Sequence, residues 1–331
     1  MKIIEQIKNI IKENFLFLLT LVFVYFLFNV DFSYIIYRPG GLIDMKNRIK
    51  TTEKYEEKGS INMTYVNGVK GSVPFLVLSK VMPNWDLVKK DNVSYDGKTL
   101  EQTEEIDKIL MQEAISNATV SAFREANIKY KINSTKFIVT QTHELVKELT
   151  YGDELLSING IDINNTDDIK KSLQNKNIGD KVTIKLKRKG KLKTVTPRLI
   201  GINNVPKIGI GYAIIYDFDS KYNIKVKTKS SESGPSGGLM TSLEIYNMIT
   251  KKDLTRGRII AGTGTIEEDG TVGVIGGIKY KLLGAEKKHA EIFICPKENY
   301  KEALKVKNKN KLKIKVYAVE NLKEAINLLK K

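Results

Sequence analysis

The chain has 331 residues, of which 41% are hydrophobic and 28% charged, so it can bury the cores of two compact domains and is not a disordered chain. Its net charge is +17, but the lysines are spread along the whole chain with few aromatic residues among them, so nucleic-acid binding is not expected. A single cysteine, Cys295, excludes an internal disulfide, and two histidines are too few for a typical zinc site. We expect no metal and no cofactor.

The N-terminal region predicts a membrane anchor. An uninterrupted apolar run over residues 15–30 follows a head, residues 1–14, that carries three lysines. The run is slightly shorter than the roughly 17 to 25 residues of a spanning helix, and residues 34–37 could extend it into the interface, giving an anchor over 15–37. No small-residue cleavage site follows, which favours a retained anchor over a cleaved signal peptide. We expect a single-pass protein of the cell membrane with a cytoplasmic head and the rest outside, although basic residues flank the run on both sides.

Residues 38–127 are expected to form a small α/β segment. Residues 58–81 predict two strands joined by a turn at Asn67-Gly68, with the alternation of a half-buried hairpin. Apolar residues at spacings of three and four then predict a helix over residues 103–126, interpreted as a scaffold element.

Residues 128–200 resemble a PDZ domain. The resemblance depends on LTYGDELLSINGIDINNTDDI, residues 149–169, in which a Gly-Asp turn precedes an apolar strand and an Asn-Gly turn precedes a helix start. The residues expected to cap that helix are Thr166, Asp167 and Asp168. The resemblance implies a module that binds an extended peptide by adding it as a strand to an open sheet edge.

The segment SESGPSGGLM, residues 231–240, stands directly before a helix predicted over residues 237–250. A Gly-Pro pair beginning at Gly234 predicts a turn, and the two glycines from Gly237 remove side chains beside Ser236, which exposes its hydroxyl next to backbone amides. Amides at the positive end of a helix stabilise a developing oxyanion in acyl transfer, so Ser236 is a candidate nucleophile. On this segment alone, an N-cap role for Ser236 is the simpler interpretation.

A second segment, residues 256–299, favours catalysis. It contains AGTGTI and GGIKYK, and together with GPSGG these motifs closely resemble those of Lon peptidases. The resemblance implies a catalytic dyad made of the motif serine and a motif lysine, here Ser236 and Lys279, which are 279 − 236 = 43 residues apart. It also implies that Thr263 lies near the lysine. The chain is most similar to membrane-anchored proteases that carry a PDZ domain before a Lon catalytic domain, here residues 201–331.

A serine–lysine dyad needs a neutral amine to accept the serine proton. Lys279 opens a predicted amphipathic helix, where partial burial would favour the neutral amine, so we expect Lys279 to act as general base and then as general acid. Three other lysines of this helix, Lys281, Lys287 and Lys288, are expected to face solvent. Gly234, Gly237 and Thr263 are expected to support the site.

The sequence contains no recognisable ATPase motif. Its only GKT, residues 97–99, lacks the glycine of a Walker A loop, because Asn92 stands at that position. We therefore expect an α+β chain with a transmembrane helix, a PDZ-like module and a C-terminal Lon domain that acts as an ATP-independent serine endopeptidase on exposed peptides or on surface and secreted proteins. Its expected partners are a peptide or protein substrate, recruited through the PDZ-like module, and the lipid bilayer; a homo-oligomer is left open. The alternative is a proteolytically inert PDZ-type peptide-binding adaptor or scaffold at the membrane.

Overall fold

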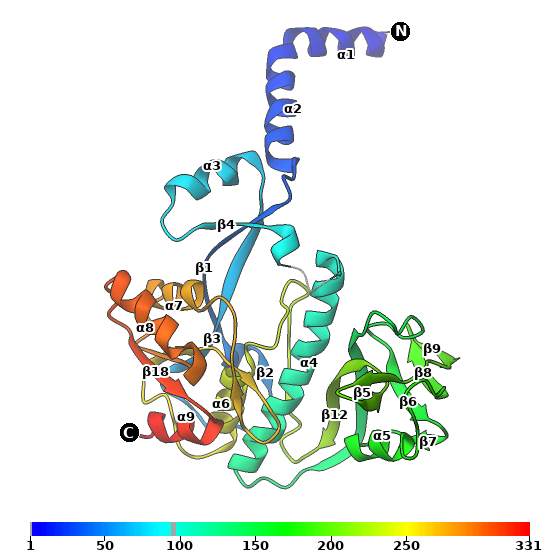
Figure 1. The fold of residues 1–331 in the computed structure, drawn as a ribbon. Helices are drawn as coiled ribbons and strands as arrows, with labels where there is room; N and C mark the ends of the chain where they lie inside the picture. The colour runs from blue at the N-terminus through cyan, green and yellow to red at the C-terminus, as the bar shows by residue number, and fades with distance from the viewer. Residues whose placement is uncertain (1, 94–96) are drawn as a thin grey trace.

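The computed structural model describes residues 2–93 and 97–331, and its centre is a six-stranded mixed sheet with the strand order β18-β17-β14-β3-β1-β4 (Figure 1). The strands are β1 (Tyr34–Asp44), β3 (Ser60–Lys70), β4 (Asp86–Lys89), β14 (Ile259–Gly262), β17 (Ile292–Pro296) and β18 (Lys315–Val319). β3, β14, β17 and β18 are parallel, whereas β1 is antiparallel to β3 and β4.

This sheet joins strands from both ends of the chain. Residues 38–127 are therefore not a separate unit, because β1, β3 and β4 complete the sheet that β14, β17 and β18 begin. The boundary predicted at residue 127 falls between the end of α4 and the first strand of the second sheet. Residues 94–96 of that segment lie outside the described part of the chain.

Helices cover both faces of the central sheet. One face carries α4 (Leu100–Glu125), α6 (Gly238–Ile249) and α9 (Leu322–Leu329), and the other carries α7 (Ile278–Lys287) and α8 (Tyr300–Lys309). The strands alternate between the two cores, as successive side chains of a strand must: Ile260 of β14 packs in the α6 core and Ala261 in the α7 core.

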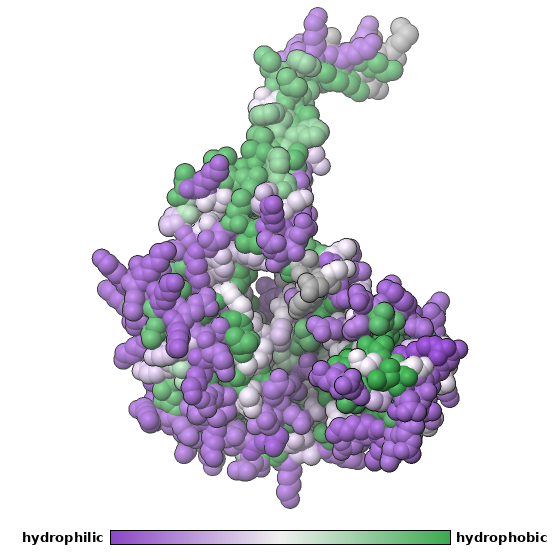
Figure 2. Space-filling model, viewed as in Figure 1, coloured by the Kyte–Doolittle hydropathy of each residue, from purple (hydrophilic) through white to green (hydrophobic). Residues whose placement is uncertain are grey.

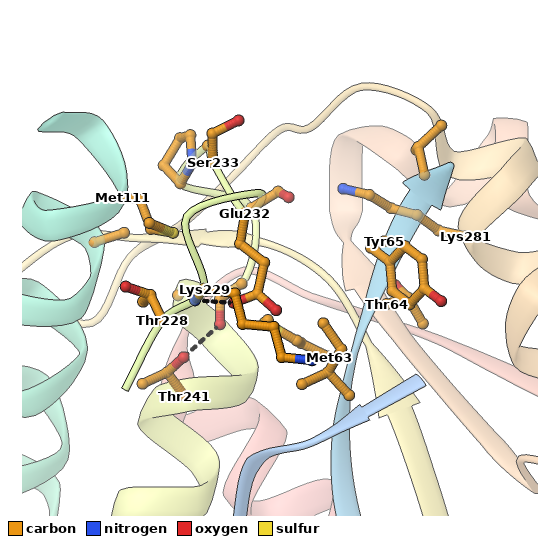
Figure 3. Close-up of a pocket in the computed structure, with 18 of the residues that line it drawn as sticks. Met63, Thr64, Tyr65, Met111, Thr228, Lys229, Glu232, Ser233, Thr241 and Lys281 are labelled. Atoms are coloured by element: carbon orange, nitrogen blue, oxygen red, sulfur yellow. Dashed lines mark hydrogen bonds between the residues drawn. The ribbon is translucent and has the colours of Figure 1, made fainter. Parts of the chain in front are cut away.

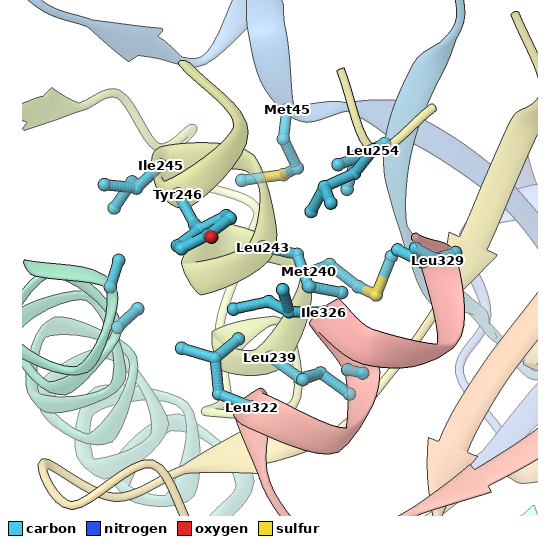
Figure 4. Packing of buried hydrophobic residues seen from close by; sticks show 14 of the residues in the cluster. Met45, Leu239, Met240, Leu243, Ile245, Tyr246, Leu254, Leu322, Ile326 and Leu329 are labelled. Atoms are coloured by element: carbon cyan, nitrogen blue, oxygen red, sulfur yellow. The ribbon is translucent and has the colours of Figure 1, made fainter. Parts of the chain in front are cut away.

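Every residue of α6 is buried. Figure 4 shows its side chains, including Leu239 and Leu243, packed against Leu322 and Ile326 of α9. A helix enclosed in this way is a rigid mount for the loop that precedes it, and that loop contains Ser236.

The second sheet has the order β12-β5-β6-β8-β9, with β7 beside β6. Its elements are β5 (Lys131–Thr142), β6 (Glu154–Ile158), β7 (Ile161–Asp162), α5 (Thr166–Ser172), β8 (Ile184–Arg188), β9 (Lys191–Val195) and β12 (Ile210–Asp219). β12 pairs with β5 from Ile210 to Asp219, so the chain returns to this sheet after residue 200. β12, which follows the boundary predicted at residue 200, thus completes the sheet as its edge strand.

Local turn chemistry in this sheet follows the sequence. Asn159 and Gly160 both have positive φ, 50° and 83°, and they join β6 to β7 as expected of an Asn-Gly turn. The helix cap differs from the prediction by one residue, because Asn165 is the N-cap of α5 and Asp168 completes a capping box with it.

The hairpin predicted over residues 58–81 is wrong. β3 runs straight through Asn67 and Gly68, because β1 pairs with both of them, and residues 73–81 form α3 (Val73–Val81) instead of a strand. A proline in the first turn of α3 suits a helix start, since its missing N–H has no partner there in any case. The helix predicted over 103–126 is α4, which begins at Leu100 behind a capping box.

Short elements complete the fold. They are β2 (Ile49–Lys50), which pairs with β13 (Lys225–Val226), the pair β10 (Ile200–Ile202) and β11 (Val205–Lys207), and the pair β15 (Thr265–Ile266) and β16 (Val272–Gly273).

Two helices, α1 (Lys2–Glu13) and α2 (Phe15–Asn29), project from the body of the molecule (Figure 1). Among the described residues, no single helix is both long enough and apolar enough to cross a membrane. The two helices over residues 4–13 and 15–29 have the required length and apolar character only when they are taken together, and a bend of 75° separates them. No side chain of α2 is buried. Residues 34–37, expected to extend the anchor, lie in β1, and Met1 of the predicted head is outside the described residues.

Candidate active site

A cavity of about 1160 Å³ opens between the central sheet, α4, α7 and the loop before α6. Its lining includes Met63 and Tyr65 of β3, Met111 of α4, Ser236 of the loop and Lys281 of α7. This volume is slightly larger than the roughly 300–1,000 Å³ of small-molecule pockets, which suits a segment of polypeptide. Of the sequence-predicted residues, Gly234, Ser236 and Gly237 line the cavity.

The loop that carries Ser236 is fixed at both ends. Gly234 has a φ of 90°, a conformation that glycine adopts without strain, and its N–H donates to the carbonyl of Asp107 in α4. Two residues later, the carbonyl of Ser236 accepts hydrogen bonds from the N–H of Gly264 at 2.9 Å and from the Thr263 hydroxyl at 3.0 Å. The backbone of the serine is therefore attached to both α4 and the end of β14.

Thr263 connects the serine loop to a lysine. Its hydroxyl donates to the Ser236 carbonyl and accepts a hydrogen bond of 3.0 Å from Nζ of Lys281. Lys281 is only 4% exposed and Thr263 is fully buried. Figure 3 shows the Lys281 side chain extending from α7 toward the loop that carries Glu232 and Ser233.

The structure reverses the expected placement of the two lysines. Lys281 was expected to face solvent and is buried in the cavity wall. Lys279, the expected base, is partly exposed and points to β4, where its Nζ lies 2.5 Å from Oδ2 of Asp86. The Tyr280 hydroxyl donates to the same oxygen at 2.6 Å. Asp86 thus holds the first turn of α7 and keeps Lys279 away from Thr263.

A sequence signal for Lys281 was present in the spacing of α7. Ile278, Lys281, Leu282 and Ala285 stand at positions i, i+3, i+4 and i+7, which are one face of a helix, and all four are buried. Lys279 lies off this face. The helical pattern therefore predicts that Lys281, which lies within the apolar stripe of α7, is buried.

Burial changes the acid–base properties of this lysine. Desolvation by the surrounding protein lowers the pKa of Lys281 to about 8, because a charged ammonium loses its hydration there. An appreciable fraction of Lys281 is therefore a neutral amine near neutral pH. Neither His143 nor His289 is among the described residues that line the cavity.

The amides at the start of α6 are only partly available. The N–H of Gly238 donates to the carbonyl of Pro235, and the N–H of Leu239 donates to the carbonyl of Gly264. Both amides are therefore already bonded within the fold. The amides of Ser236 and Gly237 are the remaining donors next to the serine hydroxyl, because no acceptor is recorded for either among the described residues.

An ion pair braces the same loop from the outside. Arg48, which follows the turn after β1, places its guanidinium 2.5 Å from Oε1 of Glu232, and the other carboxylate oxygen of Glu232 accepts from the N–H of Lys229. Glu232 thus holds the loop in place and lines the cavity.

The edge strand of the PDZ-like sheet, β12, already uses some of its outward-facing backbone amides in hydrogen bonds. Along the outer edge of β12, the N–H of Ile214 donates to Glu113 at 2.7 Å and the N–H of Tyr216 donates to Ser116 at 2.9 Å, both acceptors being α4 side chains. A peptide added to this edge would therefore find these two amides already bonded.

Comparison with known proteins assigns both regions. Residues 211–330 match the family described as the Lon protease (S16) C-terminal proteolytic domain, and residues 121–199 match the PDZ domain family. The Lon protease of Dictyoglomus thermophilum is 31% identical over 118 residues, which are 35% of this chain and 15% of that protein. Lon protease 2 of Herpetosiphon aurantiacus is 33% identical over 95 residues, 29% of this chain and 11% of that protein. The similarity thus covers only a small part of the length of these relatives.

Solved structures similar to this chain include two PDZ domains of SdrC-like proteins. That of Listeria monocytogenes covers 25% of this chain and 92% of its own, with 24% identity and a TM-score of 0.23. That of Listeria innocua covers 23% of this chain and 92% of its own, with 26% identity and a TM-score of 0.22.

The domain matches indicate a serine peptidase in a mixed α+β fold. The region that matches the Lon protease (S16) proteolytic domain follows the region that matches the PDZ domain in the chain.

Proposed function

We propose that this chain is a membrane-anchored, ATP-independent serine endopeptidase in which Ser236 is the nucleophile and Lys281 the general base. One observation carries the assignment: a buried lysine of lowered pKa shares a cavity with Ser236 and is hydrogen-bonded to Thr263, which holds the serine backbone. This assignment replaces Lys279 as the base.

Acylation follows from the acid–base state of Lys281. Its neutral amine accepts the proton of the Ser236 hydroxyl while the serine oxygen bonds to the carbonyl carbon of the substrate peptide bond. The tetrahedral intermediate then collapses with cleavage of the C–N bond, and the Lys281 ammonium gives its proton to the departing amine. Serine is left as an ester of the N-terminal fragment.

Deacylation again uses Lys281 first as general base and then as general acid. Lys281, neutral again, accepts a proton from water as the water oxygen attacks the ester carbonyl. Collapse of this second tetrahedral intermediate breaks the bond to the Ser236 oxygen, which recovers its proton from Lys281 as the carboxylic fragment leaves. No group other than the lysine needs to carry the proton.

The negative oxygen of both intermediates needs hydrogen-bond donors. The amides of Ser236 and Gly237 stand at the start of α6, where the helix dipole adds partial positive charge. We assign the oxyanion to these two amides. Thr263 orients the Lys281 amine without reacting.

The substrate we propose is an exposed segment of a peptide or of a surface or secreted protein. The size of the cavity supports an extended polypeptide, and a PDZ domain suggests peptide binding, so the PDZ sheet is the proposed recruiting element. The absence of a Walker A pattern from this sequence supports cleavage without ATP. Cleavage without ATP would favour substrate segments that are already exposed.

Membrane attachment is proposed from α1 and α2. α2 is 15 residues of almost entirely apolar sequence with no buried side chain, and such a surface is stable only against lipid or protein. α1 exposes a row of isoleucines at helical spacing, Ile4, Ile7, Ile10 and Ile11, and meets α2 at 75°, as an amphipathic helix lying on the bilayer surface would. We propose that the body of the protein lies on the extracellular side.

Purified full-length protein in detergent, assayed on a library of unstructured peptides, tests the enzymatic proposal. We expect cleavage with and without ATP, and complete loss of cleavage in Ser236→Ala. Cleavage that survives in Ser236→Ala would contradict the nucleophile, and cleavage that requires ATP would contradict the ATP-independent mechanism. A chain that binds peptides but never cleaves them would instead support the adaptor alternative.

Protease added to intact cells tests the orientation. We expect it to reach the region after Arg38 and not the head before α2. Protection of the peptidase domain would reverse the topology and place the substrates in the cytosol.

A further inference from the structure

A second apolar surface lies at the base of α2, on α3 and the turn and strand that follow it. We define the α3 patch as its large exposed apolar residues, which are Val77, Leu78, Val81, Met82 and Leu87. We propose that the α3 patch docks into the headgroup and upper acyl region of a lipid bilayer, the same bilayer that α2 enters. This inference rests on the proposed membrane anchor.

The α3 patch has no cover among the described residues of the chain. Val77 is 60% exposed and Val81 is 72% exposed, and no residue of α3 is buried. α3 has nine residues, of which Lys80 is the only charged one. A helix with this composition normally buries one face against a core, so its exposure indicates a surface that is covered in the working state of the protein.

The position of α3 is fixed next to α2. Directly after α2, the N–H of Phe32 donates to the carbonyl of Gly71, and the N–H of Gly71 donates to the carbonyl of Tyr34. Gly71 lies two residues before α3, so the helix cannot move far from the point where α2 leaves the body. Figure 2 shows the apolar surface of α2 continuing toward the side that carries α3. A bilayer that surrounds α2 therefore meets α3 at its surface.

The charges around the α3 patch select lipid over a second copy of this chain. Lys70, Lys80 and Lys89 are exposed near its edges. A symmetric dimer through this face would bring two copies of these lysines together, which is unfavourable. Anionic headgroups complement the same charges, as they do for basic residues beside other membrane-bound helices.

Aromatic and cationic groups support an interfacial location. Trp85 lies in the turn between α3 and β4, with its ring centroid 6.5 Å from that of Phe75 and the Arg38 guanidinium 5.0 Å above the ring. Tryptophan and arginine are suited to the boundary between headgroups and acyl chains, because each combines an apolar body with a polar end.

Docking of α3 would also fix the catalytic domain relative to the bilayer. Asp86 follows Trp85 directly and holds Lys279 and Tyr280, the two residues of α7 that precede Lys281. The bilayer contact is therefore adjacent to the ion pair that positions the catalytic helix. Substrate segments close to the membrane surface would be favoured over distant ones.

Trp85 is the only tryptophan in the chain, so its fluorescence reports this surface alone. Full-length protein is reconstituted into vesicles of phosphatidylcholine and phosphatidylglycerol, with or without lipids that carry bromine near the headgroup end of the acyl chain. We expect brominated lipid to quench Trp85 by at least about half. The double substitution Val77→Asp with Val81→Asp should remove most of this quenching, because it places charge where the acyl chains would lie.

A matched control substitutes two exposed leucines away from the α3 patch, Leu145→Asp with Leu192→Asp, in the PDZ sheet region. We expect this control to quench like wild type, and peptide cleavage in detergent should be unchanged in both double variants because all four side chains are exposed.

Flotation of the vesicles separates this inference from the anchor. Protein that floats with the vesicles but whose Trp85 is not quenched would overturn the α3 proposal and leave the anchor intact. Protein that does not float would contradict the anchor and the α3 proposal together. Disulfide formation between two chains of a Val81→Cys variant, combined with unquenched Trp85, would show that the patch is covered by a second copy.

Discussion

Nζ of Lys281 lies 3.0 Å from the hydroxyl oxygen of Thr263, and both side chains are buried in the wall of the cavity that contains Ser236. The nearest charged partner of the neighbouring lysine, Lys279, is Asp86 on β4. The two lysines are separated by one residue and yet lie on different faces of α7, because two positions along a helix rotate a side chain by roughly 200°. The assignment of the general base depends on this difference.

Substitution of each lysine by methionine separates their roles. We expect Lys281→Met to lower kcat/KM by roughly 10³-fold or more, as loss of the general base from a dyad does. Lys279→Met should keep most of the activity, since its partly exposed ion pair with Asp86 contributes at most about 1 kcal/mol. The measurement is steady-state peptide cleavage by the purified variants. The reverse pattern would restore Lys279 as the base.

The pH dependence of wild type should report Lys281. Because the neutral amine is the reactive form, kcat/KM is low below the pKa, rises through about pH 8 and levels off above it. A lysine in water would give a rise near 10.4, and a histidine base would give one near 6.5. The profile is measured from about pH 5.5 to about pH 10. A midpoint near 6.5 would count against the lysine mechanism.

Thr263 can be tested as a positioning residue. Thr263→Val removes the acceptor of the Lys281 hydrogen bond, so we expect kcat to fall about 10- to 100-fold, in proportion to the lost orientation of the base. The pH midpoint should also move down, because the lost hydrogen bond stabilised the charged ammonium. Thr263→Ser is the matched control and should retain both the rate and the midpoint. A rate loss with an unmoved midpoint would indicate a purely structural role.

The two glycines after Ser236 should respond differently to a methyl group. A Cβ at Gly238 would lie 2.7 Å from a methyl of Ile266 and 3.1 Å from its backbone nitrogen, so Gly238→Ala should destabilise the fold by about 1–3 kcal/mol. A Cβ at Gly237 would meet Sδ of Met63 at 2.8 Å, and this flexible side chain can move aside. Gly237→Ala should therefore be nearly neutral. Urea unfolding of both variants measures the difference, and equal losses would contradict it.

Glu244 of α6 makes stability depend on pH. It is fully buried with no recorded hydrogen-bond partner among the described residues, and burial, followed by the negative charges of Glu57 and Asp44, raises its pKa from 4.5 to about 9. A group whose pKa is raised on folding contributes stability that is complete below pH 4.5 and is lost as pH rises toward 9. Glu244→Gln cannot ionise, so its stability relative to wild type should increase across this interval.

Thermal unfolding of wild type and Glu244→Gln at a series of pH values measures this effect. Glu298→Gln, a substitution at an exposed carboxylate, is the control and should follow wild type. A constant difference between Glu244→Gln and wild type from acid to alkaline pH would show that Glu244 does not titrate with unfolding.

The sequence by itself determined the groups whose chemistry is local. The GPSGG segment predicted a serine at a helix start and Asn159-Gly160 predicted a turn, because each depends on residues that are neighbours in the chain. The expectation that Thr263 lies near a lysine came from the resemblance to Lon peptidases, and it was made for Lys279, whereas Thr263 is hydrogen-bonded to Lys281. The domain types were also readable from short motifs, and the matches to the Lon and PDZ families agree with them.

The tertiary structure decided the features that depend on contacts between elements distant in the sequence. Lys279 and Lys281 are the same type of residue in the same helix. The packing of α7 on β14 buries Lys281, whereas Asp86 of β4 forms an ion pair with Lys279. Similarly, β12 follows the predicted PDZ boundary but pairs with β5, and β3 precedes the PDZ sheet in the chain but pairs with β14, which follows it. These pairings link residues far apart in the chain, and the free energy of such long-range contacts is not expressed in any local pattern of the sequence.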